Sequence, residues 1–124
     1  MVLDAGALIA LERGDRTLWA LFKAALGRGE VPVTHGGIVG QVWRGGGARQ
    51  ARLAMALDSI EVRSVDDGLG RATGVLLSRV RRRDVIDGAL VLLAEDGDRI
   101  VTSDPLDIEP LADAAGRHVE LVVV

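Results

Sequence analysis

The stretch MVLDAGALIALERGDR, residues 1–16, places a short apolar run directly before an aspartate and a helical pattern. Residues 2–3 are typical of the end of a buried strand, and residues 5–13 repeat apolar side chains at the spacing of one helix face. Gly14 is a typical helix stop. Asp4 therefore lies between a strand and a helix, where an aspartate fits two roles, the N-cap of the helix and a ligand of a metal ion.

The composition indicates a single domain spanning residues 1–124, long enough to bury a core, with an ordinary 48% of hydrophobic residues. No apolar run approaches the ~18 residues of a membrane span. The first residues lack the basic region and cleavage site of a secretory signal. Cysteine is absent, which excludes disulfides, thiolate metal sites and a cysteine nucleophile. We therefore expect a cytoplasmic protein without a membrane partner.

Short apolar runs alternate with helical patterns along the whole chain. We expect strands at residues 2–3, 31–33, 60–65, 99–101 and 119–124, and helices at 5–13, 17–26, 35–43, 48–57, 66–80, 85–95 and 106–115. This alternation predicts an α/β fold with a mainly parallel sheet of four to five strands.

Acidic residues gather where ligands bind in such a fold, outside the carboxyl ends of the strands. Asp4 follows the first expected strand, and residues 102–104 (Thr-Ser-Asp) follow the strand at 99–101. Asp84 and Asp87 are three residues apart at the start of an apolar helix, so they share one face of its first turn. Carboxylates that lie close together repel one another, and a bound Mg²⁺ or Mn²⁺ ion usually neutralises their charges. Such a site can hydrolyse a phosphodiester.

Each acid also has a structural interpretation. Asp4 fits an N-cap. Asp84 with Asp87 fits a start resembling a capping box, which the helix dipole would support. Asp104 before Pro105 fits a turn that begins a helix. The joint placement of these acids favours a site more strongly than any one of them does.

Four segments together resemble the successive motifs of PIN-domain proteins of the VapC toxin kind. They are VLDAGALIALERGD, VWRGGGARQARLA, DVIDGALVLLAEDGD and IVTSDPLDIEPLA, which cover nearly the whole chain in the family's order. The resemblance implies a three-layer α/β/α sandwich and a ribonuclease that depends on Mg²⁺ or Mn²⁺. It also implies a homodimer and, for a toxin of a type II toxin–antitoxin system, inhibition by a cognate antitoxin.

The resemblance assigns roles to individual residues. Asp4 matches the family's first acid, and Asp87 matches the acid that opens its third motif, although Gly88 stands where the family has alanine. Asp104 matches the acid of the Thr-x-Asp element. These three would hold the metal ion and carry catalysis.

Three further side chains complete the expected site. Asp84 matches an additional acid of the third motif and would bind or orient a metal ion. Thr102 and Ser103 would orient their neighbours.

Gln41 departs from the family's pattern, because many PIN nucleases have glutamate there. Gln41 would position water at the site, but it removes one negative charge and should weaken metal affinity.

Arginines flank the expected site on two sides. Arg44 and Arg49 border the glycine run at residues 45–47, and Arg81, Arg82 and Arg83 directly precede Asp84. They fit an RNA-binding rim and equally a solvated surface. His35 and His118 are expected to be incidental, and Trp19 and Trp43 to be core or interface residues.

The leading hypothesis is a metal-dependent endoribonuclease. The alternative, which the glutamine at position 41 suggests, is a catalytically weak or inactive PIN domain that binds protein or RNA. A receiver-like domain would also hold Mg²⁺ in an acidic pocket, but it needs a lysine near the last strand. The single lysine, Lys23, lies in the second expected helix, which argues against that class.

Overall fold

The computed structural model describes residues 1–124 and contains one sheet of five strands, all parallel. The strand order is β3-β2-β1-β4-β5. The strands are β1 (Val2–Leu3), β2 (Val33–His35), β3 (Glu61–Arg63), β4 (Arg99–Thr102) and β5 (Glu120–Val123). The expected α/β class and parallel sheet are confirmed.

Seven α-helices connect and cover the strands. They are α1 (Ala5–Arg13), α2 (Arg16–Gly27), α3 (Gly36–Val42), α4 (Ala51–Leu57), α5 (Asp67–Val80), α6 (Val85–Leu93) and α7 (Pro105–Ala114). A short 3₁₀ turn at Ala48–Gln50 leads into α4. None of these helices has the length and apolar character needed to cross a membrane.

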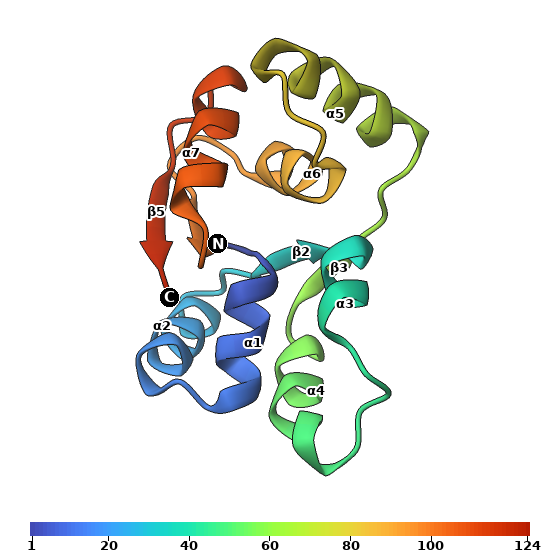
Figure 1. Ribbon diagram of the computed structural model, residues 1–124. Coiled ribbons are helices and arrows are strands. Elements are labelled where there is room, and N and C mark those ends of the chain that lie inside the picture. Colours follow the sequence, from blue (N-terminus) through green and yellow to red (C-terminus); the bar gives the residue numbers. More distant parts are fainter.

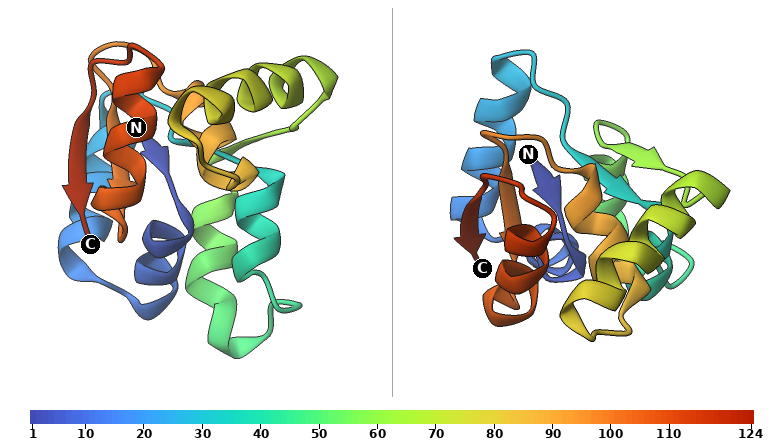
Figure 2. Two further views of the ribbon diagram at one scale, coloured as in Figure 1. Left: turned by 45° about the horizontal axis from the view of Figure 1, so that its top comes forward. Right: turned by 90° about the horizontal axis from the view of Figure 1, so that it is seen from above.

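The helices form two groups on either side of the sheet (Figure 1). Helix α1 contacts α2, α3 and α4, whereas α5, α6 and α7 contact one another. The left view of Figure 2 shows these two groups from another direction. Helix α1 also packs on β1 and β4, and α6 packs on β1 and β2, so each group reaches the central strands. This arrangement is the expected three-layer sandwich.

The second strand begins and ends later than the sequence predicts. The expectation of a strand at 31–33 and a helix at 35–43 was wrong at residue 35, because His35 has extended backbone angles and pairs with Arg63. Helix α3 therefore begins at Gly36, and the His35 ring caps it by accepting a hydrogen bond from the Gly37 amide at 3.1 Å. Pairing between strands, which periodicity does not report, determines this boundary.

Other predicted boundaries also needed correction. The strand expected at 60–65 is limited to β3, whose three residues are exposed at the edge of the sheet. The helix expected at 48–57 begins with the 3₁₀ turn, and the helix expected at 85–95 ends at Leu93. The remaining ends differ from the expected ones by one or two residues, the usual fraying of helix and strand termini.

The core surrounds β1 and β4, whose apolar side chains are buried on both faces of the sheet. Leu3 and Ile100 on these strands are fully buried, as are Leu8 of α1 and Leu90 of α6. A parallel strand covered by helices on both sides must be apolar throughout, which explains the continuous runs VL and IV in the sequence. The central strands thus become the fixed part of the molecule.

One buried amide organises the glycine-rich loop between α3 and α4. Gly45, Gly46 and Gly47 all have positive φ angles. The Gln50 side chain lies beneath them and accepts hydrogen bonds from the amides of Arg44 at 2.8 Å and Gly46 at 3.1 Å. Its Nε2 donates to Glu12 Oε1 at 2.6 Å and to the carbonyl of residue 42 at 3.0 Å. Gln50 thereby links the loop to α1.

Helices α5 and α6 approach each other closely at Gly88. A Cβ atom at this position would lie 2.9 Å from Thr73 Cγ2 and 3.2 Å from Leu77 Cδ2. Thr73 is fully buried and its hydroxyl donates to the Leu69 carbonyl at 2.7 Å, so it has little room to move. The contact explains why a residue without a side chain stands at this position.

We expect Gly88→Ala to destabilise the fold. The added methyl group meets Thr73, and overpacking of a core costs about 1–3 kcal/mol, more than the roughly 1 kcal/mol that alanine gains in helix propensity. Gly74→Ala in α5 is the matched control, because a Cβ there meets nothing within 4 Å. Urea unfolding should show a lower midpoint for Gly88→Ala and an equal or higher midpoint for Gly74→Ala. A stabilised Gly88→Ala variant would contradict the close contact.

Candidate functional site

The candidate site lies where the direction of strand order reverses in the sheet. From β1 the chain builds outward through β2 to β3, and it then returns to place β4 and β5 on the other side of β1. Loops diverge at such a point and leave a crevice at the carboxyl ends of the strands. Asp4 follows β1 and Ser103 follows β4, and the Asp4 amide donates to the Val101 carbonyl at 3.1 Å.

The Asp4 carboxylate joins these two strand ends. Its Oδ1 accepts a hydrogen bond from the Ala7 amide at 2.8 Å, and its Oδ2 accepts one from the Ser103 amide at 3.2 Å. The residue is only 5% exposed. Burial raises the pKa of Asp4, whereas the hydrogen bonds from Thr102, Ala7 and Ser103 act in the opposite direction. Asp4 is therefore the N-cap of α1 and also a buried acid at the crevice.

Thr102 and Ser103 fix the turn that follows β4. The buried Thr102 hydroxyl accepts a hydrogen bond from the Asp104 amide at 2.9 Å. The Ser103 side chain lies against the first turn of α1, where a Cβ on Gly6 would overlap its hydroxyl. Gly6 thus permits the close approach that brings Ser103 to Asp4. Both residues have positions that suit the orienting roles expected of them.

The first turn of α6 carries a second pair of acids. Asp84 is the N-cap, and its Oδ1 accepts from the Asp87 amide at 3.1 Å. The half-buried Asp87 has a pKa raised to about 6, first by burial and then by the negative charges of Asp84, Asp4, Asp107 and Asp104. The negative charges of these acids therefore act on Asp87, although no three of them are arranged closely enough to hold a metal ion.

Asp107 is an acid of this cluster that the sequence reasoning missed. It lies in the first turn of α7, three residues after Asp104, and its Oδ1 is 3.0 Å from Arg82 Nη1. The available signal was the spacing in DPLD, because residues three apart at a helix start share a face. Arg82 thereby holds one positive charge beside the acidic cluster.

His35 contacts the backbone of the α6 turn that carries Asp87. The ring is fully buried, and its Nε2 lies 2.9 Å from the carbonyl oxygen of Ile86. Because Nδ1 accepts from the Gly37 amide, Nε2 carries the proton and donates to this carbonyl. His35, which we expected to be incidental, therefore fixes the turn of α6 that carries Asp87. His118 is exposed beside Asp96, far along the chain from these contacts.

Gln41 lies on the exposed part of α3. It is one turn beyond Gly37, whose α-carbon faces the Ile86 side chain, so the two positions share the face of α3 that is directed toward α6. No hydrogen bond connects the Gln41 side chain to an acid of the cluster. Its expected role in positioning water stays a prediction.

The predicted RNA-binding arginines divide into two groups. The Arg44 guanidinium binds the last carbonyls of α3 and the following loop, namely those of Gly40, Gln41 and Trp43. Arg49 is exposed beside the same loop. Arg81, Arg82 and Arg83 are exposed between α5 and α6, and only Arg82 forms an ion pair. The second group therefore adjoins the acidic cluster, and in the first group Arg44 stabilises the end of α3.

The donor set fits a hard divalent cation in its chemistry. Carboxylate oxygens are the ligands that such ions prefer, and the acids around Asp87 carry little compensating charge. No group of three histidine, cysteine, aspartate or glutamate side chains is arranged closely enough to hold a metal ion. Asp104 is exposed and makes no capping hydrogen bond, so no contact within the protein occupies its carboxylate.

Comparison with models of known protein families found no match, and neither did comparison with curated proteins. The resemblance to PIN domains therefore stays a prediction from the four sequence motifs.

We expect Asp87→Asn to stabilise the metal-free protein at neutral pH. The folded pKa of about 6 exceeds the ordinary value near 4, so the folded chain binds this proton more tightly than the unfolded chain. Stability should therefore fall as pH rises from about 4 to 6 and stay lower above that range. Partial exposure screens the charges, which limits the effect to about 1 kcal/mol.

Urea unfolding in EDTA at pH 4 and pH 7 measures this difference. Asp113→Asn is the matched control, because Asp113 is an exposed carboxylate of α7 without an ion pair. Asp87→Asn should exceed the wild type at pH 7 and equal it near pH 4. If the wild type and Asp87→Asn lost the same stability between pH 4 and pH 7, the pKa of Asp87 would not be raised in the folded protein.

Proposed function

We propose that the protein is a metal-dependent endoribonuclease that hydrolyses RNA phosphodiester bonds, with Mg²⁺ or Mn²⁺ as its cofactor. The observation that carries the proposal is that acids from three separate segments lie near enough for the charges of Asp4 and Asp104 to raise the pKa of Asp87. Asp4 follows β1, Asp87 lies in the first turn of α6, and Asp104 follows β4. A fold gains no stability from gathering carboxylates that repel one another, so their convergence favours a functional explanation.

Asp4, Asp87 and Asp104 would hold the metal ion, directly or through water, and Asp84 would orient them. Such an ion, when bound, activates water for attack on phosphorus and offsets the negative charge that develops there. The chain's own part is to fix these oxygens. Hydrogen bonds from Ala7 and Ser103 orient Asp4, and the bond from His35 to Ile86 fixes the turn that carries Asp87.

The position of Arg82 supports a phosphate substrate. Its guanidinium reaches Asp107 at the border of the cluster, and Arg81 and Arg83 flank it in the sequence. Positive charge beside an acidic site attracts the RNA backbone without neutralising the carboxylates that bind the metal. The motif resemblance extends the proposal to a cytoplasmic toxin that forms a homodimer and is inhibited by a cognate antitoxin.

We expect the wild-type protein to cleave single-stranded RNA in Mn²⁺ or Mg²⁺ and to stop when EDTA is added. Asp87→Asn should reduce the rate by at least about 100-fold, because it removes a charged ligand from the centre of the cluster. Cleavage of a labelled RNA, resolved on a denaturing gel, measures both effects. The same two proteins test toxicity, since only the wild type should slow the growth of a bacterial host.

Asp113→Asn serves again as the control and should cleave at the wild-type rate. Unchanged activity in Asp87→Asn would remove the cluster from catalysis. Failure of the folded wild type to cut RNA in either metal would refute the enzymatic function.

A second function is favoured by two observations. No three acids are arranged to hold a metal ion, and Gln41 supplies no charge. Both suit a PIN-like domain that binds RNA or protein without hydrolysis. RNA binding by the wild type with no metal-dependent cleavage would establish this alternative.

If the site is catalytic, we expect Gln41→Glu to raise its metal affinity. The substitution adds a carboxylate on the face of α3 directed toward α6, and each added anionic oxygen ligand strengthens divalent cation binding. The Mn²⁺ concentration for half-maximal cleavage should fall several-fold. Ser78→Glu, which adds one negative charge at an exposed position of α5, is the control. An equal response in both variants would indicate a general charge effect.

A further inference from the structure

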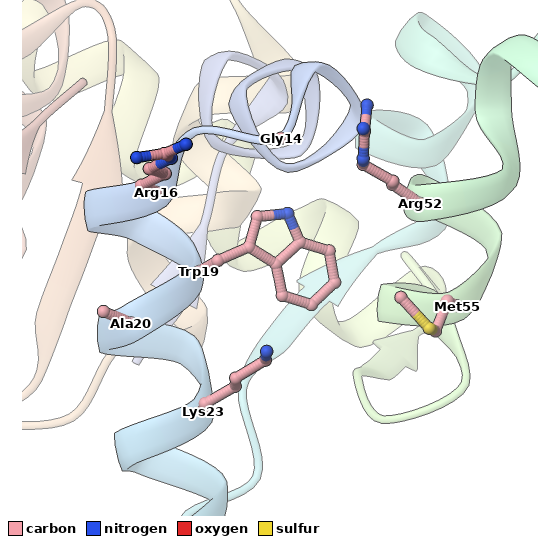
Figure 3. Close-up of a pocket in the computed structure, with 7 residues that line it drawn as sticks. All are labelled: Gly14, Arg16, Trp19, Ala20, Lys23, Arg52 and Met55. Carbon is pink, nitrogen blue, oxygen red and sulfur yellow. The ribbon is translucent and has the colours of Figure 1, made fainter.

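A pocket separate from the acidic cluster opens between the α1–α2 turn, α2 and α4 (Figure 3). Its volume is about 480 Å³. Arg16, Trp19 and Lys23 come from α2, and Arg52 and Met55 come from α4. In Figure 3 the Trp19 indole projects from α2 into the space between the two helices. The pocket thus joins an aromatic ring to several cations.

The charge of this pocket is entirely positive. Arg16, Lys23 and Arg52 line it, no aspartate or glutamate does, and none of the three forms an ion pair. The Arg52 guanidinium lies over Gly14, and its carbon is 3.2 Å from the position that a Cβ of this glycine would occupy. Three unpaired cations around one hollow attract an anion, and arginine favours phosphate or carboxylate oxygens.

Trp19 is a fixed aromatic surface within this positive field. Its Nε1 donates to the Leu11 carbonyl at 3.0 Å, and the Phe22 ring packs edge-to-face at a centroid distance of 5.4 Å. Lys23 Nζ lies 5.8 Å from the Trp19 ring centroid, near the outer limit of a cation–π contact. Met55 on the opposite wall is 60% exposed. A rigid aromatic ring beside cations suits a nucleotide, whose base stacks while its phosphate binds the cations.

Two further surface hollows lie between this pocket and the acids that follow β4. Gly14 also lines a second hollow of about 470 Å³, which follows α1 to Ser103. Ser103 borders a third hollow together with Asp104 and Asp107. The path runs along α1, whose rise of about 1.5 Å per residue separates Asp4 from Gly14 by roughly 15 Å. An extended strand of nucleic acid can follow such a path.

We propose that the Trp19 pocket binds one nucleotide of single-stranded RNA outside the bond that is cleaved. The base stacks on Trp19, and the phosphate pairs with Arg16, Lys23 and Arg52. This inference rests on the proposed function, because it names a binding site for the same substrate. The competing occupant is an acidic polypeptide, which would use the same cations but needs no aromatic stacking.

The test uses the full chain with Trp43→Phe, so that Trp19 is the only tryptophan, in EDTA, which prevents cleavage. A single-stranded RNA decamer and a glutamate decapeptide are titrated separately while Trp19 fluorescence is recorded. We expect saturable quenching by RNA alone, weakened by added salt.

Arg16→Ala with Arg52→Ala should weaken RNA binding at least ten-fold, and Lys23→Ala is a second variant at an exposed position. Arg71→Ala on α5 is the control and should bind as the parent does.

Quenching that these pocket variants leave unchanged, or no quenching by RNA, would overturn the assignment. Saturable binding of the glutamate peptide that requires the same cations, at equal or higher affinity, would also overturn it in favour of a polypeptide partner. If instead the protein binds RNA but is not a ribonuclease, the experiments give a different result. RNA would then bind at Trp19 in EDTA, yet the wild type would not cut it in Mn²⁺.

Discussion

The carboxylate of Asp4 connects the two central strands and the first helix of the molecule. One oxygen caps α1 through the Ala7 amide, and the other receives the Ser103 amide from the end of β4. Both bonds require the residue to sit where β1 ends, and β1 is the middle strand of the sheet. The structural role and the proposed metal-binding role therefore use the same atoms, which explains why a strand-end aspartate in this fold can be buried.

Electrostatic repulsion distinguishes the crevice from the rest of the surface. Most acids outside it are exposed or paired with a cation, as Asp67 is with Arg71. Around Asp87 the charges of several acids add, and Arg82 compensates only the outermost of them, Asp107. The fold maintains this arrangement because helix caps and strand ends fix the backbone, so the side chains have no means of moving far apart.

Local patterns predicted most of the fold, because buried runs and helix stops are written in the sequence. Asp4 and Gly14 marked both ends of α1 correctly. Features determined by distant contacts were less accessible. Only pairing with Arg63 reveals that His35 belongs to a strand. Asp4 and Asp104 were identified from their positions after strands, and Asp84 and Asp87 from the start of an apolar helix. Gln50 was missed, because nothing local distinguishes a buried glutamine from an exposed one.

The order of the strands also has a consequence for how the chain folds. Val2 in β1 pairs with Val33 on one side and with Ile100 on the other. The central strand is therefore completed only when two distant parts of the chain meet, and long-range parallel pairing of this kind is slow. Until β4 docks, one edge of the most apolar strand stays open to other chains. During synthesis, β1 therefore stays vulnerable to aggregation until the last quarter of the chain, which contains β4, has been made and has docked.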